Sequence, residues 1–207
     1  MPEKLKREAF LSRLQGLCST VENMRLMLVA ARHAFNRHSQ AELAEIARLR
    51  EDIIFDLDPI FEKLETDLKK GAEVDKPDLL KLQEIVSQVE LMSDKIARLA
   101  DPIRLKGNRG AILADKDLFC INDLFSQQTG FLSTLVDIFH INDASLKAYI
   151  LTEGEKLRES CLRNEVEHET RMMDSPGQGG AWSIYIDLLN RFREILGHLI
   201  NIVKSLG

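Results

Sequence analysis

The sequence predicts an all-α fold of six long helices, arranged as a tandem repeat of two antiparallel three-helix bundles. Three observations support this prediction. Apolar residues recur in alternating steps of three and four along extended stretches, which is the spacing of one helix face. Sustained alternation of apolar and polar residues, which is typical of strands, is not visible. A tight turn in the first half recurs in the second half at an offset of about 104 residues.

The first helix is predicted from the clearest apolar seam in the chain. This seam ends at a polar turn in which Ser39 is a suitable N-cap for the next helix. The helices on either side of so tight a turn should be antiparallel neighbours. The seam consists of Phe10, Leu14, Leu17, Val21, Met24, Leu28, Ala31 and Phe35.

The second helix continues the same rhythm and contains a proline. Pro59 should kink this helix, because proline removes one backbone hydrogen bond and crowds the preceding turn. Gly71 suits the left-handed residue that follows a helix, and Pro77 suits the first turn of a third helix. The seam of the second helix is Ile53, Leu57, Ile60 and Leu64.

The third helix is expected to fail within "DPIRLKGNRG", where Pro102, Gly107 and Gly110 accumulate. Residues 1–106 then form the first three-helix repeat and residues 111–207 the second, within a single domain spanning 1–207. The second repeat follows the same plan, with a tight turn at "HINDAS" and a middle helix that runs to about Met173. The seam of the third helix is Leu82, Ile85, Val89, Met92, Ile96 and Leu99.

The composition excludes several classes of protein. The chain of 207 residues is 44% apolar and 29% charged, which suits a globular protein with a substantial core. Its net charge of −5 is spread evenly, so no basic face for nucleic acid is expected. No stretch approaches the roughly 18 apolar residues of a membrane-spanning helix, and no signal peptide is visible. Three distant cysteines indicate free thiols and a cytoplasmic location: Cys18, Cys120 and Cys161.

The two third helices carry a more specific signal. In the first, Val89–Asp94 reads Val-Glu-Leu-Met-Ser-Asp, with carboxylates at Glu90 and Asp94. With two three-helix repeats and tight first turns, the chain resembles the PhoU family of phosphate-uptake regulators. That family tends to show Leu-Glu-Arg-Ile-Gly-Asp-His-x-x-Asn-Ile in this helix, where the Glu and Asp bind metal. The resemblance implies a metal site at Glu90 and Asp94.

The second copy of the motif departs from the family pattern. It reads Phe-Arg-Glu-Ile-Leu-Gly-His from Phe192 to His198, so Arg193 and Gly197 stand where the acids should be. A slip of one residue would place Glu194 and His198 in the motif as E-x-x-x-H. We prefer the first alignment, because the slip moves the apolar seams of the two helices out of register.

Residues four apart on a helix lie on one face, so Glu90 and Asp94 can approach the same cation. The resemblance implies Fe, Zn or another divalent metal, and such an ion needs further ligands. Glu51, Asp52 and Glu155 are the natural donors from the second helices, with Glu194 and His198 as weaker candidates from the last helix. The alternative for every one of these residues is an ordinary solvated charge or surface hydrogen bond on a helix.

Other polar residues are given structural interpretations. His168, with acids on both sides, is expected on a solvated helix end, although it could join a metal. The cysteines are expected to be small buried side chains. The glycines of "KGNRGA" and "DSPGQGGAW" lack the spacing of a phosphate-binding loop, so both segments are expected to be linkers.

The resemblance implies a non-enzymatic regulator of phosphate transport or phosphate signalling. Its partner would be a phosphate transporter or a sensor kinase, and a homodimer is expected. Two other functions remain open, namely a helical adaptor unrelated to phosphate and a carboxylate-bridged metal enzyme. The enzyme would need a Glu-x-x-His motif on each of two helices, and only Glu165–His168 has that form.

Overall fold

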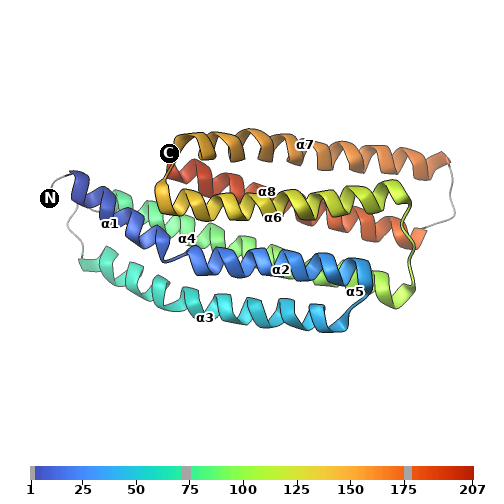
Figure 1. Cartoon of the computed structure of the whole chain (residues 1–207), viewed down its shortest axis with the longest axis horizontal. Helices are drawn as coiled ribbons and strands as arrows, with labels where there is room; N and C mark the ends of the chain where they lie inside the picture. Colours follow the sequence, from blue (N-terminus) through green and yellow to red (C-terminus); the bar gives the residue numbers. More distant parts are fainter. Residues whose placement is uncertain (1–2, 71–75, 175–178) are drawn as a thin grey trace.

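The computed structural model describes residues 3–70, 76–174 and 179–207, and its secondary structure over these residues is helical. The predicted all-α fold is confirmed. Eight helical segments make six long rods, because α1 runs into α2 and α4 runs into α5 (Figure 1). The segments are α1 (Glu3–Gln15), α2 (Cys18–Arg37), α3 (Gln40–Lys70), α4 (Lys76–Ala97), α5 (Ala100–Arg109), α6 (Asp115–Ile141), α7 (Ala144–Asp174) and α8 (Gly179–Leu206).

The first rod is interrupted, whereas the sequence predicts one continuous helix. At the junction of α1 and α2 the Leu17 N–H donates to Leu14 O, three residues back, at 2.9 Å. Gly16 lies in this tightened turn. Apart from proline, glycine is the residue that least favours a helix interior. Leu14 and Leu17 are both fully buried, so the apolar seam passes through the break.

The third rod ends within the predicted segment, but only at its last residue, Gly110. The helix breaks earlier, between α4 and α5, and then continues through most of the expected linker to Arg109. Pro102 explains the break, because its ring lacks an N–H and crowds the carbonyl of Arg98. Instead, Asp101 N–H donates to Arg98 O at 3.2 Å. The rod ends at Gly110, whose φ of 56° is the left-handed conformation that glycine adopts readily.

Most of the remaining helix ends agree with the sequence, but α8 begins at Gly179, inside the segment expected to be a linker. Helix α3 includes Pro59 and continues to Lys70, while Gly71 lies outside the described residues. Pro77 is in the first turn of α4. Helix α7 reaches Asp174, one residue past the predicted end.

The two tight turns share one geometry at the predicted offset. His38 and Asn142, at φ 54° and 49°, are the non-glycine residues with positive φ among those described. In the first turn, Ser39 Oγ accepts a hydrogen bond from the backbone N–H three residues on, at 3.3 Å. In the second, Asp143 Oδ1 accepts the corresponding bond at 3.0 Å. The internal repeat is therefore visible in backbone conformation as well as in sequence.

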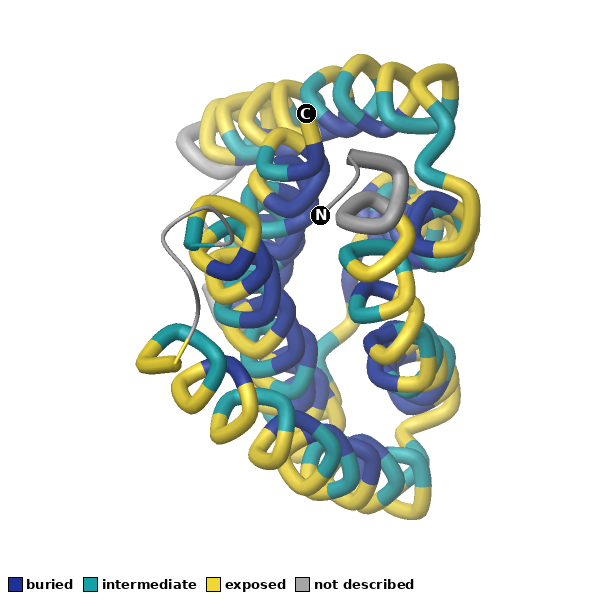
Figure 2. Tube along the Cα trace, turned by 90° about the vertical axis from the view of Figure 1, so that its left-hand side faces the viewer, coloured by how far each residue is buried: buried dark blue, intermediate teal, exposed yellow. Residues whose placement is uncertain are grey.

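The rods pack so that equivalent helices of the two repeats meet at the centre. Helix α2 packs against α6, and α4 packs against α8, while α3 and α7 lie along opposite edges (Figure 1). Viewed along the rods, the buried residues line the inward side of each helix (Figure 2). The Phe125 ring lies 6.1 Å from the Phe35 ring and 4.8 Å from the Phe192 ring, which joins α2, α6 and α8 in one core.

Candidate functional site

The two third helices, α4 and α8, lie side by side and carry the two copies of the motif. Val89 and Phe192 are both fully buried, as the preferred alignment requires. The alternative alignment would match Val89 with Arg193, which is partly exposed and pairs with Glu165 at 3.1 Å. Burial therefore favours the register in which the second copy lacks both acids.

The carboxylates of the first copy lie on the outer side of α4. Glu90 is exposed, and Asp94 Oδ2 lies 2.8 Å from Nε of Arg98 on the same helix. Next to them, Lys95 bridges to α8, where its Nζ lies 3.1 Å from Glu194 Oε2. Asp94 and Glu194 thus each have a cationic partner from the chain.

His198 is half-buried between the same two helices. Its Nδ1 lies 2.8 Å from Gln88 Oε1, which makes Gln88 the acceptor and the imidazole the donor. Burial lowers the pKa of His198, and the positive charge of Lys95 lowers it further. The neutral ring is the form that binds metals, and because Nδ1 donates to Gln88, only Nε2 would be free to act as a ligand.

The predicted donors from the outer helices are surface residues. Glu51 is exposed on α3, and Asp52 Oδ2 lies 2.6 Å from a guanidinium nitrogen of Arg48. On α7, Glu155 Oε2 lies 2.8 Å from Arg158 Nε. Within residues 3–70, 76–174 and 179–207, no three His, Cys, Asp or Glu side chains come together in a way that could hold a metal ion. The metal site at Glu90 and Asp94 remains a prediction.

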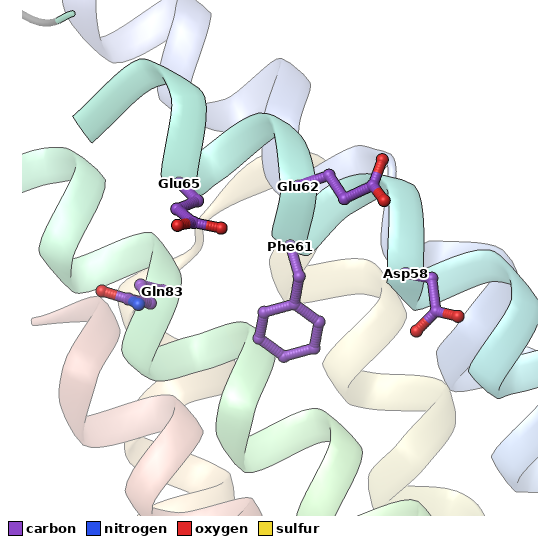
Figure 3. A pocket seen from close by; sticks show the side chains of 5 residues that line it. All are labelled: Asp58, Phe61, Glu62, Glu65 and Gln83. Carbon is purple, nitrogen blue, oxygen red and sulfur yellow. The ribbon is translucent and has the colours of Figure 1, made fainter. Parts of the chain in front are cut away.

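An acidic hollow of about 340 Å³ lies between α3 and α4 (Figure 3). Three of its lining residues are acids from α3, and the sequence shows the beginning of this run in "REDIIFDLDPIFE". Glu65 in this group already pairs with Lys69 at 2.6 Å. The hollow is open to solvent, so these acids are best described as a solvated face. Its lining residues are Asp58, Phe61, Glu62, Glu65 and Gln83.

A buried polar cluster connects α6, α7 and α8 on the other side of the bundle, and the sequence analysis did not predict it. His168 is only 7% exposed, so the predicted solvated helix end is wrong. Its Nδ1 lies 3.2 Å from Asp117 Oδ2, and Asp117 Oδ1 accepts from Arg171 at 2.6 Å. The His168 ring packs 4.6 Å from that of Tyr185, and burial lowers the pKa of the imidazole. His168 lies seven residues after Cys161, on the same buried face of α7. This spacing is the signal in the sequence that could have predicted the burial of His168.

The environments of the three thiols favour their protonated form. Burial raises the pKa of Cys161 to about 12, and it also raises those of Cys120 and Cys18. Cys120 shares a hydrogen bond with Tyr185. Since the thiolate is the nucleophile, these environments do not activate cysteine. Cys161 is buried as predicted, whereas Cys18 and Cys120 are only partly buried.

The architecture defines a class of protein: a helical bundle of two three-helix repeats, with the first helices paired and the third helices paired at its centre. This is the fold of the PhoU proteins. The chain aligns with the crystal structure of the phosphate transport system regulatory protein PhoU from Streptococcus pneumoniae with a TM-score of 0.80 at 17% identity, covering 97% of this chain and 94% of that one. PhoU from Pseudomonas aeruginosa aligns with a TM-score of 0.79 at 17% identity, covering 98% and 96%.

Sequence comparison adds no further relative. No protein-family model and no curated protein matches the chain. The predicted resemblance to PhoU is confirmed as a likeness of fold over nearly the whole length of both chains.

Proposed function

We propose that this protein is a non-enzymatic, cytoplasmic regulator of phosphate transport or phosphate signalling that acts through protein–protein contacts. The observation that carries the proposal is the end-to-end likeness to the S. pneumoniae phosphate transport system regulatory protein. Its partner would be a phosphate transporter or a sensor kinase. A regulator of this kind works by docking, so it needs an accessible surface rather than an enclosed active site.

The surface of the bundle is compatible with docking. Several large apolar side chains are exposed on the helices, including Phe55 on α3 at 79% and Phe119 on α6 at 76%. None of the helices within the described residues has the length and hydropathy needed to span a bilayer. The unactivated thiols and the ion-paired carboxylates give no support to an enzymatic role.

Deletion of the gene in its host tests the proposal directly. We expect phosphate uptake, measured with radiolabelled phosphate in replete and limiting medium, to lose its normal dependence on phosphate supply. A tagged full-length chain should capture a phosphate transporter subunit or a sensor kinase from the same cells. Unchanged uptake together with capture of partners unconnected to phosphate would favour the helical adaptor instead.

Two predictions from the resemblance accompany the proposal. For the metal, purified protein is incubated with Fe, Zn or Mn and its metal content is measured by elemental analysis. We expect the double variant Glu90→Ala, Asp94→Ala to lose the metal. The control variant Glu159→Ala, which removes an exposed acid on α7, should keep it. Equal metal contents in both variants would reject the site. For the homodimer, light scattering during size-exclusion chromatography measures the mass against the 23.6 kDa chain.

A further inference from the structure

A small hollow lies where α2 ends, α3 begins and α5 passes them. Its volume is about 130 Å³, and its polar lining comes from His38, Gln40, Arg104 and Asn108. Each of these side chains offers N–H donors, and none of the residues lining the hollow is an acid. The chemistry of the wall therefore suits an acceptor-rich ligand.

A buried lysine lies directly behind this wall. Lys106 is 6% exposed, and its Nζ donates to Phe35 O at 3.1 Å and lies 4.9 Å from the Phe35 ring centre. Burial lowers the pKa of Lys106. Over the described part of the chain, no carboxylate is within ion-pair distance of this Nζ. Its hydrogen bond to Phe35 O places the ammonium at the C-terminal turn of α2, where the helix dipole stabilises a cation, so the lysine brings positive charge to this corner of the bundle.

His38 connects the lysine to the hollow. Lys106 Nζ lies 3.5 Å from Nε2 of His38, and because an ammonium can only donate, Nε2 is the acceptor and the ring proton is on Nδ1. That atom faces Gly107 in the wall, since a Cβ added to Gly107 would lie 3.4 Å from it. The lysine thus turns the N–H of His38 toward the hollow.

Arg104 is available to a ligand. Its guanidinium lies 3.6 Å from Asp101 Oδ1, and both side chains are at least half exposed. Charge-assisted hydrogen bonds are shorter, at about 2.7 to 2.9 Å, so this ion pair leaves the donors of Arg104 largely unused.

We propose that this hollow binds a small tetrahedral oxyanion such as inorganic phosphate or sulfate. Arg104 and the Nδ1–H of His38 donate to the anion, the amides of Gln40 and Asn108 complete its shell, and Lys106 adds positive charge behind His38. The volume of about 130 Å³ suits a small anion. The proposal stands apart from the regulatory role, which requires docking and not anion binding.

Calorimetric titration of the full-length protein with inorganic phosphate at low ionic strength tests the site. We expect saturable binding to one site, shared by sulfate and not by chloride. Arg104→Ala should weaken it at least about tenfold, because a charge-assisted hydrogen bond is lost. Arg158→Ala, which removes an exposed arginine on α7, should leave the affinity unchanged.

Two results would overturn the proposal. One is the absence of saturable binding by either phosphate or sulfate. The other is an equal loss of affinity in Arg104→Ala and Arg158→Ala, which would show that the anions respond to overall charge. Arg104 is half exposed, so its alanine variant should fold, and circular dichroism verifies this. Phosphate uptake in the deleted strain is measured separately, so failure of the anion site leaves the regulatory proposal standing.

Discussion

Replacing Asp117 by alanine should destabilise the protein far more than removing a comparable surface carboxylate. The Asp117 side chain is 3% exposed and contacts both Arg171 and His168. Its loss leaves their polar atoms unpaired in the core, and breaking a buried pair costs about 3 to 5 kcal/mol. Arg171 is 40% exposed and can turn toward water, so we expect the lower end, about 3 kcal/mol.

Thermal unfolding followed by circular dichroism measures this difference. For a chain of this size, about 3 kcal/mol corresponds to a decrease in Tm of about 6 to 12 °C. The matched control is Asp187→Ala, because Asp187 pairs with Arg191 at 3.0 Å but is 44% exposed. That change should cost about 0.2 to 1 kcal/mol. Equal decreases in Tm for the two variants would refute the argument that burial makes the Asp117 cluster important.

Three further predictions concern pH, backbone conformation and packing. Burial lowers the pKa of His168 below 6.5, so on acidification the unfolded chain binds a proton there before the folded chain does, and the free energy of unfolding should fall as pH decreases below about 6.5. Denaturant titrations across this range should show a flatter pH dependence for His168→Gln. An unaltered pH dependence in this variant would contradict the assignment. Gly110→Ala should lower the free energy of unfolding by about 1 kcal/mol, because Gly110 has a positive φ. Gly130→Ala within α6, where an added Cβ has open space, should raise the free energy of unfolding by up to about 1 kcal/mol. Urea midpoints that move in the same direction in both variants would argue against this. Phe125→Ala should lower the free energy of unfolding by about 3 to 5 kcal/mol, because the Phe125 ring joins three helices. Phe119 is 76% exposed, so Phe119→Ala should change the unfolding midpoint little. A similar loss of stability in both variants would mean that the core is not centred on Phe125.

The fold was largely predictable because its signals are local. The seam from Leu14 to Phe35 marks the buried face of the first rod, and Ser39 marks the turn after it. The misplaced break near Pro102 has a simple cause. Proline disturbs the carbonyl four residues before it, so a helix can break ahead of the proline and resume with that residue in its first turn.

The site was less predictable because its residues meet across helices. Glu90 and Asp94 are placed on one face of α4 by spacing alone, but only the packing of α4 on α8 brings Lys95 to Glu194. In the same way, no local pattern predicts that Lys106 lies beneath the Phe35 carbonyl.

The sequence by itself determined most of the helical stretches, where the two turns fall and that the halves repeat, since these depend on periodicity and on caps within a few residues. The tertiary structure alone decided which charges are buried and what they face. The seven-residue spacing from Cys161 indicates that His168 is buried, but the groups that His168 and Lys106 face belong to residues far away in the chain, so no local spacing predicts these pairings.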